Sequence, residues 1–127
     1  MDMTNMSEFK NEEFDIVIDK ATFDALMVAE ENVWEPSENC IKQADSFLGE
    51  TSRILKQNGY FLSISFAQTH FRTKYLMNSI EEFQVSPYKS LKGFCEKYSW
   101  NLSFKSIGGF EGSLDTFFYV MKKCDSE

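Results

Sequence analysis

The sequence is poor in the residues that build metal centres or cross membranes. Its three cysteines, Cys40, Cys95 and Cys124, lie far apart without a Cys-x-x-Cys pair, and His70 is the single histidine. Structural zinc sites need closely spaced Cys and His ligands, so we expect free thiols and no metal site. No stretch approaches the ~20 apolar residues that cross a bilayer. The opening residues MDMTNMSEFK hold no apolar run typical of a secretory signal. These absences predict a protein of the cytoplasm or nucleus without a membrane partner.

Positive charge is also in the minority. The 13 Lys and Arg residues stand against 20 Asp and Glu residues, which gives a net charge of −7. Proteins that bind nucleic acid use clustered Lys and Arg to neutralise phosphates, so we expect no nucleic-acid partner. An acidic surface suits a basic protein partner, and ordinary solubility explains the same charge.

Apolar residues are plentiful by contrast. They make up 43% of the 127 residues, and Phe alone occurs 13 times. This content is enough for one domain around one core and argues against disorder.

The first half of the chain alternates strand and helix patterns. The run FDIVID at 14–19 is β-branched and uninterrupted, which predicts a strand buried on both faces of a sheet. Helical patterns follow at 20–29 and at 38–57, where Asn58-Gly59 is a typical helix stop, and a second strand is expected at 60–67. A strand, helix, strand order of this kind predicts parallel pairing. In the second helical pattern, the spacing places five residues on one face of the expected helix: Ile41, Ala44, Leu48, Thr51 and Leu55.

The second half ends in a hairpin pattern. Ser86-Pro87 predicts a helix start, and the expected helix continues through Leu91, Phe94, Cys95 and Tyr98. Residues 100–107 and 116–121 read as strands joined by a glycine-rich connection, which predicts an antiparallel hairpin. The last strand is apolar on both faces and should lie inside the sheet. The fold class is therefore α/β, with a mostly parallel sheet and a C-terminal antiparallel hairpin.

Residues Phe14 to Ala25, FDIVIDKATFDA, carry a recognisable motif. They match the pattern Phe-Asp-x-Val-x-(Asp/Glu)-Lys-Gly-Thr-x-Asp-Ala at all but one of its defined positions, since Ala21 stands where the pattern has Gly. The stretch from Ser52 to Arg72 and the C-terminal FFYVMKK resemble the same group of proteins. That group is the class I S-adenosylmethionine-dependent methyltransferases, and within it the eukaryotic lysine methyltransferases of elongation factor 1-alpha and their relatives. The resemblance covers nearly all of the chain and implies a partial Rossmann-like fold.

Two features depart from that family. The segment 74–100 is longer than in the nearest relatives. The family's glycine-rich cofactor turn has no counterpart, because the glycines at 49, 59, 93, 108, 109 and 112 form no Gly-x-Gly. We therefore expect residues 1–127 to be the C-terminal part of a methyltransferase domain, with the N-terminal glycine-rich part absent. The family's first strand would neighbour 14–19, so this strand should become a free edge and promote self-association.

The resemblance also implies roles for individual residues. Asp2 and Met3 match the pair that meets the adenine ring, and Lys20 matches a lysine that contacts the cofactor. Asp19 is the candidate catalytic residue, which orients or deprotonates the incoming amine. A solvated acid–lysine pair is the alternative for Asp19 and, less strongly, for Lys20, and a disordered chain start is the alternative for Asp2 and Met3. Thr22 and Asp24 are expected to be structural, as helix cap and first-turn acid.

The function implied is S-adenosylmethionine-dependent N-methylation of a protein lysine, on elongation factor 1-alpha or another cytosolic protein. The chain alone is expected to bind the cofactor poorly. The alternatives are a non-catalytic remnant or interaction module with this fold, and half of a nicotinamide enzyme, which the hairpin and the Asp-Lys stretch disfavour. His70, Phe71 and Arg72 follow the second strand, where they are weaker candidates for a substrate channel.

Overall fold

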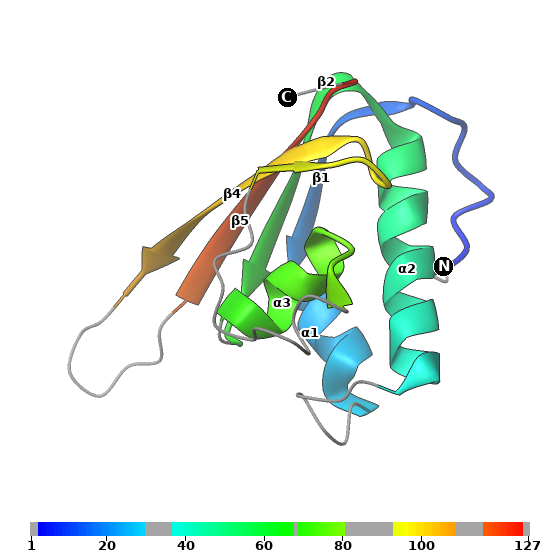
Figure 1. Ribbon diagram of the computed structural model, residues 1–127. Helices are drawn as coiled ribbons and strands as arrows, with labels where there is room; N and C mark the ends of the chain where they lie inside the picture. The colour runs from blue at the N-terminus through cyan, green and yellow to red at the C-terminus, as the bar shows by residue number, and fades with distance from the viewer. Residues whose placement is uncertain (1–2, 30–36, 68, 81–92, 109–115, 126–127) are drawn as a thin grey trace.

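The computed structural model describes residues 3–29, 37–67, 69–80, 93–108 and 116–125, arranged as one sheet with helices packed against it (Figure 1). In chain order the elements are β1 (Phe14–Lys20), α1 (Thr22–Leu26), the 3-10 turn η1 (Met27–Ala29), α2 (Glu38–Ile54), β2 (Leu55–Ser65), α3 (Thr69–Leu76), β3 (Gly93–Cys95), β4 (Trp100–Ile107) and β5 (Thr116–Lys123). None of the helices in these ranges is long and apolar enough to cross a membrane.

The five described strands lie in the order β1-β2-β5-β4-β3. β1 and β2 are parallel, as the strand, helix, strand order predicts. β5 runs antiparallel to both β2 and β4, so the C-terminal hairpin is confirmed and β5 lies inside the sheet. β3 also pairs antiparallel with β4. The sheet is therefore mixed, and its parallel part is smaller than expected, because among the described strands only β1 and β2 pair with each other in parallel.

β1 lies at an edge of the described sheet and is covered on one face only. Ile16 is 54% exposed and Ile18 is 69% exposed, whereas Val17 and Asp19 face the helices. The free edge agrees with the sequence expectation, and the expected burial on both faces is wrong. A continuous apolar run shows that both faces suit burial, but it does not say which part of the protein buries them.

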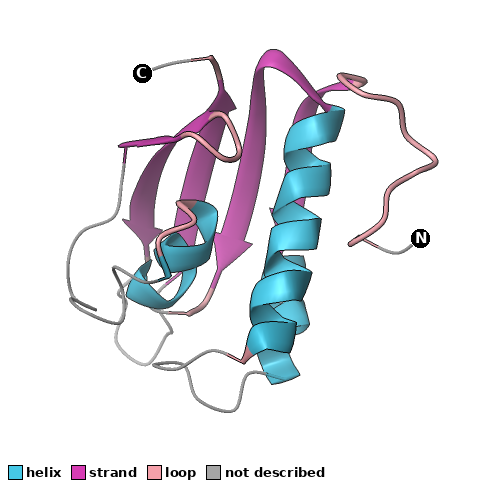
Figure 2. Ribbon diagram, turned by 45° about the vertical axis from the view of Figure 1, so that its right-hand side comes forward, coloured by secondary structure: helices cyan, strands magenta, loops and turns pink. Residues whose placement is uncertain are grey.

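The core lies between the sheet and the helices, all of which pack on the same side (Figures 1 and 2). Phe23 of α1 stacks on Phe47 of α2, with ring centroids 5.5 Å apart, and meets Tyr75 of α3 edge-on at 5.9 Å. Phe61 of β2 continues this aromatic layer towards Trp100 of β4 at 5.7 Å. Such aromatic pairs contribute about 0.5–1.5 kcal/mol each beyond their buried area. Phe23, Phe47 and Phe61 thus supply much of the aromatic contact between sheet and helices.

α2 ends at Ile54 and passes directly into β2, which is earlier than predicted. Lys123 caps the end of the helix, because its Nζ donates hydrogen bonds of 2.7 Å to the carbonyl oxygens of Ser52 and Leu55. A cation at a helix C-terminus satisfies free carbonyls and favours the helix dipole. Burial lowers the pKa of this lysine. The helix therefore needs no Gly stop, and Asn58-Gly59 serves another purpose.

Asn58 and Gly59 form an irregularity within β2. Asn58 has a φ of 68°, and the register with β1 jumps between the pairs Phe14–Leu55 and Ile16–Tyr60. A Cβ on Gly59 would lie 2.8 Å from the carbonyl oxygens of both Asp15 and Lys56. Glycine is thus required here because two backbone segments approach closely.

The expected helix through Phe94, Cys95 and Tyr98 is wrong where the structure describes it. Gly93–Cys95 forms β3, and a turn leads from it into β4. The start of that expected helix at Ser86-Pro87 lies outside the described residues. α3 occupies a stretch in which the sequence showed no clear pattern.

Replacing Gly59 with alanine should lower the free energy of unfolding by about 1–3 kcal/mol, because the new methyl group meets backbone that has little room to shift. Gly49→Ala is the matched control. It lies within α2 with no atom within 4 Å of a new Cβ, so it should raise the free energy of unfolding by about 0.5–1 kcal/mol. Urea unfolding followed by circular dichroism measures both changes. Equal effects of the two substitutions would contradict the close approach at Gly59.

Candidate functional site

The candidate site lies where the parallel strands β1 and β2 end together. The register pairs Asp19 with Ser63 and Lys20 with Ile64. Because ligands of open α/β sheets bind at the carboxyl ends of parallel strands, this is the edge where a site is expected. The location predicted for Asp19 and Lys20 is therefore confirmed.

Asp19 is buried and its carboxylate joins three segments. It is 3% exposed. Its Oδ1 accepts hydrogen bonds from the backbone amides of Thr22 at 2.6 Å and Phe23 at 3.2 Å, and its Oδ2 accepts one from the Ser63 hydroxyl at 2.8 Å. Asp19 thus caps α1, and the cap predicted at Thr22 is wrong. Thr22 is already inside the helix, where it donates its amide to Asp19 instead of supplying the acceptor.

Ala21 keeps the backbone conformation for which glycine is the usual residue. Its φ is 61° and its ψ is 13°, in the left-handed region. A left-handed residue with a Cβ costs roughly 1–2 kcal/mol. Its amide donates a 3.0 Å hydrogen bond to the Ile64 carbonyl, which ties this turn to β2. The substitution of Gly by Ala therefore leaves the turn in place at some cost in strain.

Asp24 forms a second carboxylate anchor at the same edge. Its oxygens accept hydrogen bonds from the Ser65 hydroxyl at 2.6 Å, the Phe66 amide at 2.9 Å and Arg72 Nε at 2.9 Å. Burial alone raises the pKa of Asp24, but these bonds and the Arg72 charge outweigh it, and the net pKa lies below its ordinary value of 3.8. Asp24 therefore joins α1, the end of β2 and α3, which agrees with the structural role expected for it.

The structure brings two of the four predicted site residues, Met3 and Asp19, to one cavity. Met3 and Asp19 line one mostly apolar cavity of about 250 Å³ between the N-terminal segment, β1 and α2. Lys20 is exposed, and strand alternation places it on the opposite face of the sheet from Asp19. Asp2 lies outside the described residues. Within the described ranges, no group of three or more His, Cys, Asp or Glu side chains is placed to hold a metal ion.

The N-terminal segment that carries Met3 is held against α2 by two charged side chains. Arg53 donates to the carbonyl oxygens of Met6 at 2.8 Å and Phe9 at 3.0 Å, and Glu50 accepts a 2.7 Å bond from the Met6 amide. Hydrogen bonding by Arg53 lowers the pKa of Glu50 despite partial burial. Met3 is thus part of a fixed cavity wall, which the resemblance alone did not show.

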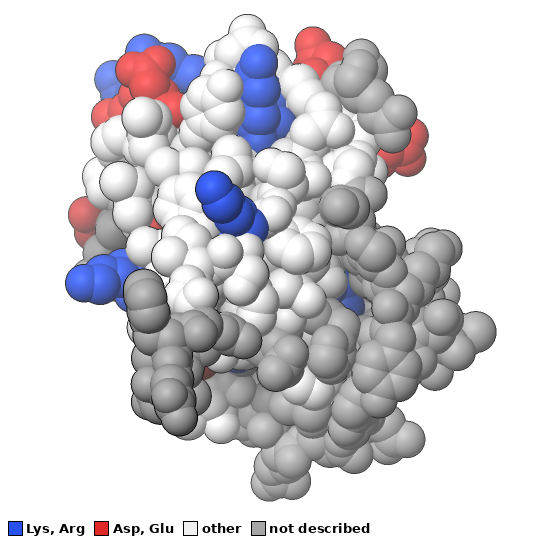
Figure 3. Space-filling view, turned by 90° about the vertical axis from the view of Figure 1, so that its left-hand side faces the viewer, with Lys and Arg blue, Asp and Glu red and all other residues white. Residues whose placement is uncertain are grey.

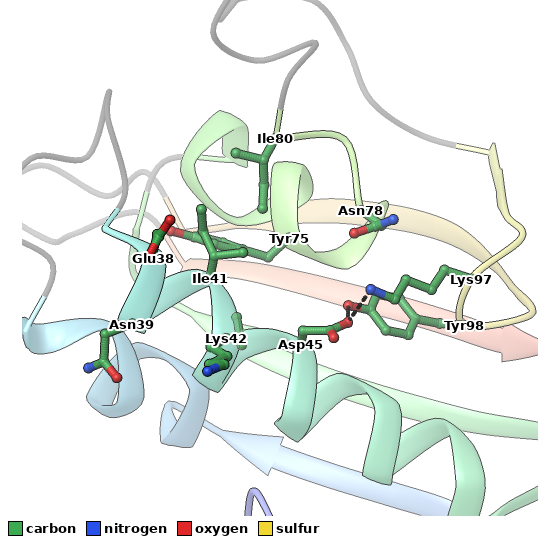
Figure 4. Close-up of a pocket in the computed structure, with 11 residues that line it drawn as sticks. Glu38, Asn39, Ile41, Lys42, Asp45, Tyr75, Asn78, Ile80, Lys97 and Tyr98 are labelled. Carbon is green, nitrogen blue, oxygen red and sulfur yellow. Dashed lines mark hydrogen bonds and ion pairs between the residues drawn. The ribbon is translucent and has the colours of Figure 1, made fainter.

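A second cavity, of about 490 Å³, contains none of the predicted site residues (Figure 4). It lies between the N-terminal half of α2, the residues after α3 and the turn before β4. Asp45 of α2 pairs with Lys97 at 2.7 Å and accepts a 2.7 Å hydrogen bond from the Tyr98 hydroxyl. Burial raises the pKa of Tyr98, and the hydrogen bond to Asp45 raises it further. These contacts fix the turn before β4 onto α2.

Sequence reasoning missed the partners of the two carboxylates. Ser63 and Ser65 occupy alternate positions of β2 on the helix-facing side and bond Asp19 and Asp24. Small hydroxyl residues on the buried face of a strand, opposite large apolar residues, are a usable signal for such anchors. Arg72 was considered for a substrate channel and instead pairs with Asp24. The side chain of His70 lies outside the described parts of the chain.

Asp24→Asn should lower the free energy of unfolding at neutral pH by about 2–3 kcal/mol, because it leaves Arg72 without its charged partner. A lowered folded-state pKa stabilises the fold above the unfolded value of 3.8, and that contribution is lost as pH falls through the folded-state pKa. The difference between wild type and variant should therefore shrink below about pH 4. Urea midpoints measured from pH 3 to pH 8 test this.

Asp15→Asn is the matched control for Asp24→Asn. Asp15 pairs with Lys56 at 3.8 Å, and its side chain is 83% exposed. Its removal should change stability by no more than about 0.5 kcal/mol at any pH. A pH-independent loss in Asp24→Asn would show that the ion pair is not what stabilises this edge.

The chain is similar in sequence to several curated proteins, although no family model matches it. It is 31% identical over 116 residues to EEF1A lysine methyltransferase 4 of Bos taurus, and the match covers 91% of this chain and 37% of that protein. The Mus musculus protein of the same name is 28% identical over 116 residues, covering 91% of this chain and 38% of that protein. The chain thus spans under two fifths of the length of these relatives.

Two further comparisons also point to methyltransferases. The eEF1A lysine and N-terminal methyltransferase of Homo sapiens is 42% identical over 74 residues, covering 58% of this chain and 10% of that protein. Among solved structures, a SAM-dependent methyltransferase from Methanosarcina mazei superimposes with a TM-score of 0.50 at 15% identity, over 100% of this chain and 66% of that chain. The chain is thus similar in sequence to eEF1A lysine methyltransferases, and its fold is similar to that of a SAM-dependent methyltransferase.

Proposed function

We propose that this chain forms part of a protein-lysine N-methyltransferase that uses S-adenosylmethionine and acts in the cytoplasm on eEF1A or another protein. The observation that carries the proposal is the Asp19-Lys20 pair at the carboxyl end of a strand parallel to β2, within a sequence similar to proteins named for eEF1A lysine methylation. Parallel strand ends are the usual ligand sites of such sheets.

The cavity lined by Met3 and Asp19 fits one side of a nucleoside cofactor. Its volume of about 250 Å³ lies below the roughly 300–1,000 Å³ of most small-molecule sites. No Gly-x-Gly turn occurs in the sequence to form an opposite side. We therefore propose that these residues supply one wall of the cofactor site and that another polypeptide segment supplies the glycine-rich wall. In this proposal Asp2 and Met3 meet the adenine, and Lys20 contacts the cofactor from the strand tip.

Asp19 acts in this proposal by positioning. S-adenosylmethionine supplies a methyl group on a sulfonium, and the acceptor must be a neutral amine held in line with it. Both carboxylate oxygens of Asp19 already accept hydrogen bonds from α1 and β2. Of the two roles expected for Asp19, orientation of the strand-end loop fits these bonds better than removal of a proton from the amine.

A non-catalytic interaction module is the second candidate, and the exposed isoleucines of β1 favour it. The two functions separate in a methyl-transfer assay with eEF1A and labelled S-adenosylmethionine. Incorporation above background excludes the non-catalytic module. If no labelled methyl group is incorporated even when a relative's glycine-rich segment is added as a separate polypeptide, the methyltransferase function is excluded.

S-adenosylhomocysteine should bind the isolated chain only weakly, with a dissociation constant on the order of millimolar. Amide chemical shifts in NMR spectra should move at Met3, Asp19 and Lys20. Lys20→Ala should weaken binding about three- to tenfold, because it removes one charge-assisted contact. Lys56→Ala is the control, because it changes an exposed lysine of β2 that pairs with Asp15, at the end of β1 away from Lys20.

Two results of this titration would contradict the proposal. Micromolar affinity would show that one wall is sufficient. Shift changes confined to other regions, or no changes at millimolar concentration, would remove Asp19 and Lys20 from the cofactor site.

We also propose that isolated chains associate through the free edge of β1. An unpaired strand edge presents backbone donors and acceptors to a second strand, and β1 has no neighbour on that side among the described strands. Light scattering should give a mass that rises with concentration. Amides of β1 should gain protection from hydrogen exchange in the associated form. A monomer at all concentrations, or association without protection of β1, would contradict edge pairing.

A further inference from the structure

The face of the sheet turned away from the helices forms a continuous surface of outward side chains. The strand register arranges them in three rows: Ile16, Tyr60, Lys122 and Asn101; then Ile18, Leu62, Val120 and Ser103; then Lys20, Ile64, Phe118 and Lys105. We call these twelve residues the open sheet face. The helices contact only the opposite face, where Phe61 and Tyr119 are fully buried.

The centre of the open sheet face is apolar and poorly covered. Ile16, Ile18 and Tyr60 are among the most exposed large apolar residues of the described chain, and Leu62, Ile64 and Phe118 are only partly buried. Monomeric soluble proteins rarely leave contiguous apolar patches larger than a few hundred Å² in water. Sheets with parallel strands are usually covered on both faces. These properties indicate a surface that binds another polypeptide.

The charges of the open sheet face are all of one sign. Lys20, Lys105 and Lys122 stand at its outward positions, and none of the twelve residues is acidic, although the whole chain has a net charge of −7. Figure 3, which views the molecule from the side away from α2, shows Lys and Arg side chains within a largely uncharged surface and Asp and Glu near its margins. Lysine stems also cover apolar surface while the ammonium stays in water; Lys122 Nζ lies 5.9 Å from the Tyr60 ring centre.

The occupant must therefore be apolar in the middle and acidic at its sides. A second copy placed face to face would bring lysines against lysines, which disfavours it. An amphipathic helix fits better, because its apolar stripe can lie along the Ile18, Leu62 and Val120 row while flanking carboxylates reach the lysines of the outer rows. The surface also continues around the free edge of β1, since Ile16 and Ile18 line the 250 Å³ cavity as well.

We propose that the open sheet face is a docking surface for an amphipathic helix whose apolar stripe is flanked by Glu or Asp. This inference does not depend on methyl transfer and assigns the surface opposite the helices to a protein partner. Lys20 borders both this surface and the candidate cofactor site, so the test uses the other two lysines.

Two synthetic helical peptides test the docking surface. They share one leucine stripe, and the stripe is flanked by Glu in one peptide and by Lys in the other. Fluorescence anisotropy with the 127-residue chain should show the Glu peptide binding on the order of tenfold more tightly at low salt. That preference should shrink as ionic strength rises. Equal affinities, a preference for the Lys peptide, or no binding would overturn the proposal.

Matched variants assign the binding to this face. Ile18→Ser should weaken both peptides, whereas Val28→Ser should not, because Val28 is 81% exposed on η1 and away from the face. Lys105→Glu combined with Lys122→Glu should reverse the peptide preference, and Lys42→Glu on α2 should leave it unchanged. Unaltered urea midpoints show that the variants fold. Val120 lies in the same row on the inner strand β5, away from the β1 edge. A dimer of the wild-type chain that Val120→Ser dissolves would therefore assign the face to a second copy and overturn the helix.

Discussion

Two carboxylates at the ends of two parallel strands fix the arrangement on which the rest of the structure depends. Asp19 ties α1 to β2 through Ser63, and Asp24 ties α1 to the end of β2 and to α3 through Ser65 and Arg72. The same short helix is therefore held from both sides of its first turn. Because buried polar groups need hydrogen-bond partners, the partners of these two acids determine where the turn at Lys20–Ala21 lies. The same hydrogen bonds therefore set the geometry of any ligand site at this edge.

Local sequence pattern determines some elements of the fold, and tertiary contacts determine the others. β1, β4 and β5 follow from β-branched or alternating runs that only strands accommodate, and the hairpin follows from the glycines between them. Phe94, Cys95 and Tyr98 have helical spacing but form a strand and a turn, because pairing of Gly93–Cys95 with β4 provides hydrogen bonds that a short isolated helix lacks. Asn58-Gly59 resembles a helix stop, yet α2 is ended by Lys123, some 70 residues further along the chain. A cap supplied from so far away leaves no local pattern.

The site was predictable to a similar extent. Strand order placed Asp19 and Lys20 at a parallel strand tip, since that position depends only on the direction of two neighbouring strands. Which acid caps the helix was not predictable, because Thr22 and Asp19 both suit a cap and only the left-handed turn at Ala21 directs the Asp19 carboxylate to the helix amides. Because successive side chains of a strand point to opposite faces, Asp19 and Lys20 also lie on opposite faces of the sheet. Two adjacent residues of one motif thus belong to different surfaces.

This separation gives the sheet two proposed binding surfaces that meet at Lys20. Asp19 faces the helices and the cavity with Met3, whereas Lys20 stands in an outer row of the open sheet face beside Ile64, Phe118 and Lys105. A carboxylate of a helix docked on that face would attract the Lys20 ammonium outward, away from a cofactor contact at the strand tip. A partner without a carboxylate near Lys20 would instead cover the lysine stem and leave its head free. The position of acidic residues on the partner would therefore decide whether the proposed docking competes with the proposed cofactor binding or supports it. The physical basis is a single side chain, Lys20, that borders both surfaces.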